Sequence, residues 1–378
     1  MIYFDNASTG GFKPNSVVET LTNSVKYLCA NPNRSGHRKA IIGMQTIHKT
    51  RCNLATYFGG NSDRVVFTKN CTESLNLAIF GTLKKGGHVI TTVYEHNSVL
   101  RPLFALEKQG LITLDIVKPH SHKNLVKAIK EKINDKTYLI VTTAVSNVTG
   151  IALPVKEIGA LAKEHDIKYL VDGAQAGGHI PLDLSNDNIS MLALAGHKGL
   201  YGIMGSGVLI FDDKTDVEPL IYGGTGTLSF DLNQPQFYPE KLESGTLNLP
   251  SIFALLEGVN YIFPNMQNFS ELLTKMTTAL FDGLKTIDGV SLYSMPNPCG
   301  IVAFSVKNIP STTVADILDT EYDIAVRSGL HCAPLMHKYL RTEENGLVRV
   351  SLAVQNTSSE ISFFINAINE IVSKNSVN

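Results

Sequence analysis

The residues best suited to chemistry lie in the middle of the chain, around a lysine set between glycines. Lys198 stands in residues 191–202 (MLALAGHKGLYG), and residues 168–175 (KYLVDGAQ) end in an acid and an amide. A lysine amine can form a Schiff base with an aldehyde, and a buried carboxylate can keep a pyridine nitrogen protonated. An amide can hold a ring hydroxyl, and a histidine beside the lysine can reach a phosphate. These groups form a set suited to pyridoxal 5'-phosphate (PLP): Asp172, Gln175, His197 and Lys198.

Each member of this set also has an ordinary explanation. A lysine flanked by glycines is commonly a solvated loop residue. An acid at the end of an apolar strand is frequent in α/β proteins, because ligand-facing loops follow the carboxyl ends of strands. A single histidine is more often structural than ligand-binding. The order and spacing of all four residues together favour the cofactor site.

Three further turns could contribute to the same site. Thr72, in the segment NCTE, would bind a phosphate at a helix N-terminus, although a helix cap by Asn70 or Thr72 explains the same residues. His96, in YEHNS, could stack on a pyridine ring and move protons, or be a surface histidine at a helix start. Asn147, in SNVTG, could hold a ring hydroxyl or a substrate carboxylate, or be an ordinary turn residue.

Two residues of the C-terminal third stand out in the same way. Arg349 lies in the alternating apolar segment LVRVSLAV, where an arginine needs an anionic partner or a wet face. A substrate carboxylate would supply that anion, and so would an internal Asp or Glu. Cys332 lies in RSGLHCAPL, where His331 and Arg327 could make a thiol ionise more readily through positive charge. A buried structural cysteine is the alternative.

The pattern between residues 87 and 211 predicts a scaffold for these groups. Short apolar runs alternate with amphipathic segments, which favours a mostly parallel sheet covered by helices. The predicted strands are HVITTVY, LITLDIV, TYLIVTTAV and IKYLVD, and the predicted helices cover residues 97–109, 122–133 and 154–165. Another helix is predicted in SLNLAIFGTL, directly after NCTE. We therefore expect an α/β fold.

The remainder of the chain has a different texture. Residues 223–250 are rich in Gly, Pro, Thr and Asn and predict a long functional loop. Beyond about residue 258, helical patterns at 268–285 and 358–374 alternate with short strands, which is typical of a smaller α+β domain.

Composition bounds the function. A chain of 378 residues can form two domains, and its net charge of -1 gives no reason to expect nucleic acid or an anionic membrane. No apolar run approaches the roughly 18 residues that span a bilayer, and the N-terminus lacks a secretory signal pattern. Five cysteines without a CxxC pair predict no disulfide framework and no metal site. We expect a cytoplasmic protein without membrane or nucleic-acid partners.

Taken together, these segments resemble the class V aminotransferases. The shared motifs, in order, are FDNAST, NPNRSGHR, NCTESLNLA, YEHNS, SNVTG, VDGAQ, GHKGLYG, ESGT and RSGLHCAPL. Within that superfamily the chain is most similar to the cysteine desulfurase and selenocysteine lyase branch, over nearly its whole length. The resemblance implies a fold-type I PLP protein with a mixed, mostly parallel seven-stranded sheet. It also implies a large domain at 15–258, a small α+β domain built from 1–14 and 259–378, and a homodimer with shared active sites.

The resemblance also assigns roles to residues. Lys198 would be the Schiff-base lysine, Asp172 the partner of the ring nitrogen and Gln175 that of the ring hydroxyl, with His96 stacked on the ring and catalytic. Thr246 would reach the cofactor phosphate of the neighbouring subunit. The implied cofactor-binding residues are Cys71, Thr72, His96, Asn147, Asp172, Gln175, His197, Lys198 and Thr246. The implied substrate-binding residues are Asn147, Arg349, Arg327 and Arg34.

Two positions depart from the pattern of many relatives. Ala195 stands where a serine is common, and Cys71 stands where a second threonine is common. Each change removes a hydroxyl donor for the phosphate. Other donors remain, so we expect PLP to bind with weaker affinity.

The resemblance predicts a PLP-dependent desulfurase that converts L-cysteine to L-alanine, with Cys332 taking the sulfur as a persulfide and a further protein accepting it. A related lyase acting on selenocysteine, cysteine sulfinate or another C–S bond is the alternative, because the segment around Cys332 differs from familiar sulfur-mobilising enzymes. A catalytically idle homologue is a third possibility, which the intact Lys198 disfavours.

Overall fold

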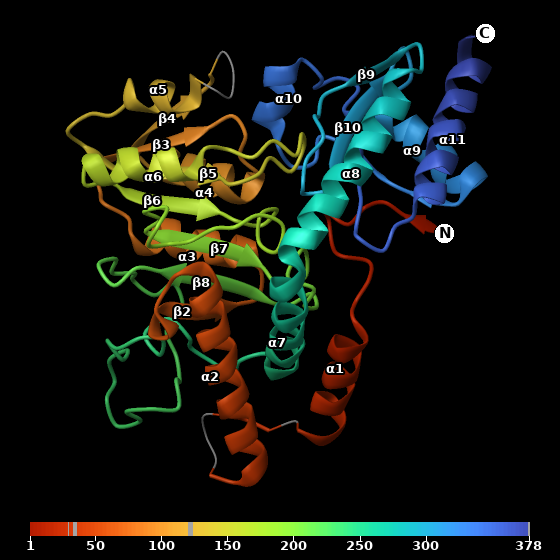
Figure 1. Cartoon of the computed structure of the whole chain (residues 1–378). Helices are drawn as coiled ribbons and strands as arrows, with labels where there is room; N and C mark the ends of the chain where they lie inside the picture. The colour runs from red at the N-terminus through yellow and green to blue at the C-terminus, as the bar shows by residue number, and fades with distance from the viewer. Residues whose placement is uncertain (29, 33–35, 120–123, 377–378) are drawn as a thin grey trace.

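The structure is a computed structural model that describes residues 1–28, 30–32, 36–119 and 124–376 (Figure 1). A seven-stranded sheet has the order β2-β8-β7-β6-β5-β3-β4. Its strands are β2 (Val65–Thr68), β3 (Gly87–Thr92), β4 (Ile112–Val117), β5 (Thr137–Thr143), β6 (Lys168–Asp172), β7 (Met191–Ala195) and β8 (Gly207–Phe211). Strands β3 to β7 are parallel, and β8 is antiparallel to both β7 and β2. The predicted mixed, mostly parallel sheet of seven strands is confirmed.

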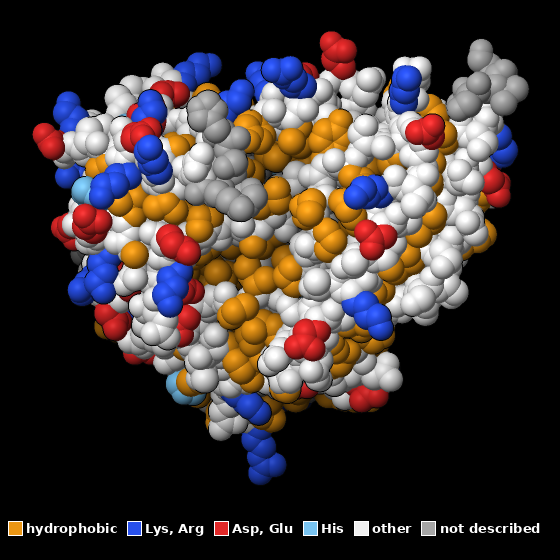
Figure 2. All heavy atoms as spheres, turned by 45° about the horizontal axis from the view of Figure 1, so that its top comes forward, with side chains coloured by type: hydrophobic (Ala, Val, Ile, Leu, Met, Phe, Trp, Pro, Cys, Tyr) orange, Lys and Arg blue, Asp and Glu red, His pale blue; other side chains and the backbone are white. Residues whose placement is uncertain are grey.

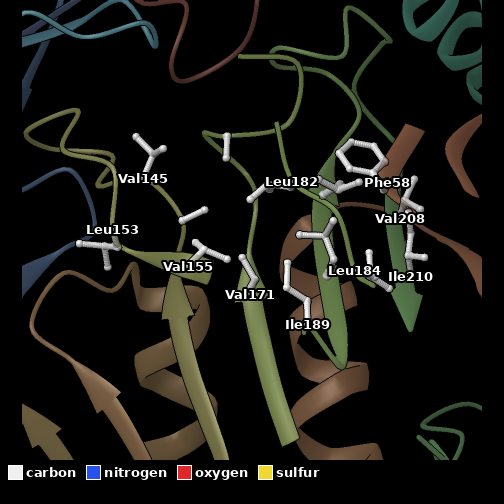
Figure 3. Packing of buried hydrophobic residues seen from close by; sticks show 14 of the residues in the cluster. Phe58, Val145, Leu153, Val155, Val171, Leu182, Leu184, Ile189, Val208 and Ile210 are labelled. Atoms are coloured by element: carbon white, nitrogen blue, oxygen red, sulfur yellow. The ribbon is translucent and has the colours of Figure 1, made fainter. Parts of the chain in front are cut away.

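The central strands are buried on both faces, as their composition requires. β7 and β8 bury every residue, and β6 buries all but Lys168. Such near-continuous apolar runs are typical of a sheet covered by helices on both sides. Figure 3 shows Val171 of β6 and Val208 and Ile210 of β8 in a hydrophobic cluster that Phe58 also joins. This packing gives the strand ends a rigid base.

Seven helices accompany this sheet in the described part of the chain, and four of the seven lie in the chain between two of its strands. They are α1 (Asn15–Tyr27), α2 (Arg38–Phe58), α3 (Cys71–Gly81), α4 (Asn97–Lys108), α5 (Leu125–Lys130), α6 (Val155–Glu164) and α7 (Leu249–Ile262). The helices predicted at 97–109 and 154–165 are confirmed to within a residue at each end. α5 is shorter than the predicted 122–133, whose first two residues lie outside the described part of the chain. Residues 212–248, all of them described, contain no helix or strand, in agreement with the predicted long loop.

A second, antiparallel sheet carries the C-terminal part, in the order β12-β13-β10-β9. Its strands are β9 (Val290–Leu292), β10 (Ile301–Val306), β12 (Arg327–Gly329) and β13 (Leu347–Ser351), and the helices of this part are α8 (Met266–Lys285), α9 (Ser311–Tyr322), α10 (Pro334–Leu340) and α11 (Ser358–Ser376). The start of the chain joins this part, because β1 (Ile2–Tyr3) pairs with β11 (Ile324–Ala325) and Asp5 bridges to Ser351. The domain boundary at residue 258 stays a prediction.

The parallel strands of the large sheet point toward the second sheet. In Figure 1 the arrows of β5, β6 and β7 end on the side of the molecule that carries α8 and β10. Because the carboxyl ends of parallel strands form ligand sites in α/β sheets, the side chains that follow these strands are placed to face the C-terminal part.

The molecular surface carries no dominant charge on the face that Figure 2 shows. Lysine, arginine and acidic side chains are interspersed around a central area of hydrophobic side chains. This mixture agrees with the net charge of -1 and gives this face no field of a single sign. No helix in the described part of the chain is long and apolar enough to cross a membrane.

Candidate active site

The carboxyl ends of β6 and β7 hold the predicted acid and lysine. Asp172 ends β6 and is 3% exposed, and Lys198 follows β7 on a turn closed by the N–H of Tyr201, which donates to the Lys198 carbonyl at 3.0 Å. Gly199 is needed in this turn, because a Cβ there would lie 2.4 Å from the carbonyl oxygen of Gly177. Burial lowers the pKa of Lys198 despite the opposing charge of Asp172. Lys198 therefore loses its proton more readily than an exposed lysine and forms the neutral, nucleophilic amine.

The carboxylate of Asp172 is oriented by two donors on one oxygen. Its Oδ1 accepts the N–H of Ala174 at 2.9 Å and the thiol of Cys71 at 3.6 Å. Burial, reinforced by the charge of Asp172, raises the pKa of the Cys71 thiol, so that it stays protonated and can donate. The cysteine that departs from the pattern of relatives thus contacts the acid of the site.

The N-termini of α3 and α4 meet beside this pair. The side chain of Asn70 caps α3 by accepting the N–H of Glu73 at 2.9 Å, so the Thr72 hydroxyl is not the cap. Instead, Thr72 Oγ1 lies 2.8 Å from Ser98 Oγ, which is also 2.9 Å from His96 Nδ1. The first N–H groups of a helix have no intrahelical acceptor, so this corner can bind an anion such as a phosphate.

Two histidines and a glutamine complete this side of the site. Burial lowers the pKa of His96 and of His197 to about 4, so both rings are neutral near pH 7 and act as hydrogen-bonding groups rather than cations. His197 Nδ1 lies 3.1 Å from Thr9 Oγ1, and Gln175 Nε2 donates to the carbonyl of Ala7 at 3.0 Å. The N-terminal segment therefore closes the site from the side of the C-terminal part.

Arg349 is almost fully buried and only partly satisfied. Its Nη2 donates to the carboxylate of Asp5 at 3.0 Å and to Ser8 Oγ at 2.9 Å, and its Nη1 donates to the carbonyl of Asn147 at 2.9 Å. Its Nε is buried and has no partner among the described residues. The internal acid considered for Arg349 is thus present, and the N–H of its Nε remains for a further acceptor. Buried unsatisfied donors are rare, which makes a substrate carboxylate a suitable partner.

Cys332 is an exposed residue on a backbone that is held at two points. It lies between β12 and α10, where the N–H of Asn97 donates to the Cys332 carbonyl at 2.7 Å and Asn147 Nδ2 donates to the His331 carbonyl at 2.8 Å. His331 and Cys332 both adopt left-handed φ angles, 50° and 55°. Such strained residues persist where surrounding contacts impose them. The guanidinium of Arg327 lies 3.6 Å from the Cys332 sulfur.

His331 does not supply the positive charge that its position beside Cys332 predicted. Its ring is buried and stacked on His337, with centroids 5.6 Å apart and Nδ1 3.4 Å from His337 Nε2. Burial lowers the pKa of His331 to about 2, so the ring is neutral. The prediction was wrong because the ring packs into the interior while the neighbouring thiol faces solvent. The charge beside the thiol belongs to Arg327.

Thr246 and Arg34 are the remaining predicted residues. Thr246 is exposed, and its hydroxyl accepts a hydrogen bond from Asn31 Nδ2 at 3.3 Å. Arg34 lies outside the described residues. Sequence reasoning assigned no role to Asp5, Ser8 or Ser98, although all three stand in motifs that carry the resemblance, FDNAST and YEHNS.

The donor set fits PLP. A lysine of lowered pKa stands by a buried, oriented carboxylate, and a hydroxyl at a helix N-terminus offers an anion site beside a neutral imidazole. These groups match the aldehyde, the ring nitrogen, the phosphate and the ring face of the cofactor in chemistry. The buried Nε of Arg349, which has no partner among the described residues, can accommodate an anionic group.

Known proteins are similar to this chain in sequence and in fold. The Aminotransferase class-V family model matches residues 2–364. A probable cysteine desulfurase of Pyrococcus abyssi is 34% identical over 386 residues, which cover 98% of this chain and 94% of that protein. The apo structure of a cysteine desulfurase from Thermococcus onnurineus superposes with a TM-score of 0.92 at 32% identity, covering 99% of this chain and 95% of that one. An S-sulfonic acid form of an Escherichia coli cysteine desulfurase has a TM-score of 0.89 at 26% identity, covering 98% and 94%.

The fold is that of a fold-type I PLP enzyme. The chain belongs to the class-V aminotransferase family, and its cofactor is PLP.

Proposed function

We propose that this protein is a cysteine desulfurase that converts L-cysteine to L-alanine and takes the sulfur onto Cys332. The observation that carries the proposal is the exposed thiol of Cys332, whose carbonyl accepts from Asn97 while the preceding carbonyl, of His331, accepts from Asn147. Asn97 directly follows His96, and the carbonyl of Asn147 accepts from Arg349. A thiol that must attack a substrate sulfur is thus held beside the residues that serve cofactor and substrate.

The transfer balances without a further reactant. The Cys332 thiolate attacks the sulfur of cysteine, an S–S bond forms, and the bond between that sulfur and Cβ breaks. The carbon takes up a proton, so cysteine and a thiol become alanine and a persulfide. Arg327 stabilises the attacking thiolate from 3.6 Å.

The other residues bind the reactants and move protons. PLP, when bound, supplies an electron sink that makes the bonds at Cα and Cβ of an amino acid labile. Lys198 would carry it, and the lowered pKa of Lys198 lets its Nζ accept the substrate Cα proton. Asp172 would keep the ring nitrogen protonated, while Thr72 and His197 would hold the phosphate. Arg349 would bind the substrate carboxylate.

The desulfurase is further proposed to be a homodimer in which Thr246 serves the neighbouring site. Support comes from the exposed loop that precedes Thr246, where Tyr222, Leu228, Phe230 and Leu232 are largely exposed. Large apolar side chains gathered on a surface commonly mark an interface. Sedimentation of the cofactor-loaded protein should give twice the chain mass of 41.2 kDa, and a fully active monomer would refute the assignment.

The proposal has one consequence for the sulfur acceptor and one for the cellular compartment. A persulfide on Cys332 has to pass its sulfur to an acceptor thiol or acceptor protein before the next turnover. The exposed thiol needs a reducing compartment to stay free, which favours the cytoplasm.

The test compares two cysteine variants. Cys332→Ala should still bind PLP but release sulfide from cysteine at a rate lower by about 100-fold, since the attacking atom is gone. Cys52→Ala, which changes the half-buried cysteine of α2, should match the parent. Mass mapping after a single turnover should find one added sulfur on Cys332.

Selenocysteine separates the related activities. Its breakdown can persist in Cys332→Ala, because selenium leaves more readily than sulfur and need not be attacked. If Cys332→Ala desulfurates cysteine at the parent rate, the protein is a C–S lyase and the desulfurase proposal fails.

A further inference from the structure

The edge of the seven-stranded sheet at β2 is covered by two side chains instead of another strand. Arg51 of α2 donates to the carbonyl of Val65, and Glu243 Oε1 accepts the N–H of Phe67 at 2.7 Å. These two backbone groups belong to alternate residues of an edge strand, which normally presents them for pairing. A guanidinium and a carboxylate here take the place of a neighbouring peptide backbone.

The two side chains also form an ion pair that holds them in one geometry. Arg51 Nη2 lies 2.5 Å from Glu243 Oε2, and Nη1 lies 3.0 Å from Oε1. Both side chains are less than 10% exposed, and the guanidinium lies 4.7 Å above the ring centroid of Phe67. A paired arrangement of two parallel hydrogen bonds fixes orientation as well as distance. Buried pairs of this kind add little stability over apolar side chains of the same size, so their orienting effect is the better explanation.

The ion pair connects two parts of the chain that each carry a proposed phosphate-binding residue. β2 runs directly into the turn that opens α3, where Thr68 Oγ1 lies 2.7 Å from Ser74 Oγ and donates to the Asn70 carbonyl at 3.1 Å. Thr72 stands in that turn. Glu243 is the first residue of ESGT, which ends in Thr246. The N–H of Gly245 in the same segment donates to the carbonyl of Gly224 at 2.9 Å, which attaches this segment to an earlier part of the same long loop.

We propose that Arg51 is a positioning residue that, through Glu243, fixes the Thr72 turn and the Thr246 segment as one unit for binding cofactor phosphates. Arg51 contacts neither the cofactor nor the substrate. In a dimer the unit serves two sites, its own through Thr72 and that of the partner copy through Thr246. The inference rests on the proposed roles of Thr72 and Thr246 and extends them to a residue that sequence reasoning did not single out.

The test uses a ligand that lacks only the phosphate. Full-length Arg51→Met/Glu243→Met, which leaves no unpaired buried charge, is freed of cofactor and titrated with PLP and with pyridoxal, following the absorbance of the Lys198 adduct. Affinity for PLP should fall about tenfold, the effect of one lost charge-assisted hydrogen bond, while affinity for pyridoxal stays within about twofold. An unchanged ratio of the two affinities would overturn the proposal.

Arg51→Lys provides a second variant that keeps the charge. A lysine cannot bond both carboxylate oxygens and the Val65 carbonyl in the same fixed plane, so its loss of PLP affinity should be smaller and in the same direction. If the double variant does not fold, as judged by circular dichroism, this variant decides. Sulfide release by the parent protein is measured separately, so a failure of the desulfurase function is distinguished from a failure of the role of Arg51.

Mixed dimers test whether the unit reaches across to the partner copy. A chain that carries Lys198→Ala together with Arg51→Met and Glu243→Met is paired with a parent chain. Only the parent chain then offers Lys198. The PLP on that chain should dissociate faster than in a dimer of the parent with Lys198→Ala alone. Equal dissociation rates would show that Glu243 does not act on the partner's site and would overturn this part of the proposal.

Discussion

The thiol of Cys71 and the carboxylate of Asp172 form a hydrogen bond of 3.6 Å in the buried floor of the site. The same carboxylate oxygen accepts the N–H of Ala174. The donors come from the start of α3 and from the turn after β6, so the position of the acid depends on a helix as well as on its own strand. Both donors bond a carboxylate oxygen, so they fix the position of the charged group of Asp172.

Asp172→Asn tests that charge. An asparagine keeps the size and polarity of the side chain but cannot keep a ring nitrogen protonated. We expect the variant to bind PLP and to lose about 100-fold or more in turnover, because the electron sink is lost. Absorbance gives the bound cofactor and alanine formation gives the rate. Activity within a few-fold of the parent would contradict the role.

Lys198 has a rival amine close by, which makes a matched control available. Lys13 Nζ donates to the carbonyl of His197 at 3.1 Å, and burial lowers the pKa of Lys13 to about 8. Borohydride treatment of the PLP-loaded protein followed by peptide mapping should place the pyridoxyl group on Lys198. Lys13→Arg should retain this label and Lys198→Arg should lose it. A label on Lys13, or none in protein supplied with PLP, would contradict the assignment.

Arg327 and His331 predict different effects on the reactivity of Cys332. The guanidinium favours the thiolate, while the neutral, inward-facing imidazole does not. Arg327→Gln should slow iodoacetamide alkylation of Cys332 about two- to fivefold at neutral pH, the effect of one exposed charge at short range. His331→Gln should change the rate by less than about twofold. Equal slowing in both variants would mean that His331 carries charge after all.

Glu95 predicts a pH-dependent stability difference. Its carboxyl is fully buried, with Oε1 accepting the Thr92 hydroxyl at 2.5 Å and Oε2 without a partner among the described residues. Burial, with a smaller contribution from Asp172, raises the pKa of Glu95 well above its ordinary value. A raised pKa in the folded state gives stability that is complete below the unfolded-state pKa and is lost as pH rises toward the folded-state pKa.

Glu95→Gln removes this dependence while keeping the shape. The stability of the variant relative to the parent should therefore increase as pH rises from about 5 to 8, by at most about 1.4 kcal/mol per pH unit. Urea unfolding of both proteins at several pH values measures the difference in the free energy of unfolding. A difference that does not vary with pH would mean that Glu95 is ionised in the folded protein.

The sequence predicts the parts of the site that depend on neighbouring strand ends. Asp172 ends the predicted strand IKYLVD, and the carboxyl ends of parallel strands form ligand sites. The run MLALA before Lys198 was not among the predicted strands, although it forms β7 beside β6. The role of His331 was not predictable in this way, because its neutrality depends on stacking against His337 inside the fold. Local patterns likewise show that Arg349 needs an anion without showing which one. The pairing of Arg51 with Glu243, 192 residues apart, leaves no local signal at all.

The contact between Arg349 and Asp5 joins residues 344 positions apart. A ribosome releases Asp5 well before Arg349, so the substrate side of the pocket cannot assemble until the 344 residues that separate them have been added. The strands that carry Asp172 and Lys198 emerge much earlier and can pack first, since domains generally fold in the order of their synthesis. A nascent chain would thus acquire the means to capture the cofactor before it can hold an amino acid, and a chain that stops before Arg349 would have no complete site.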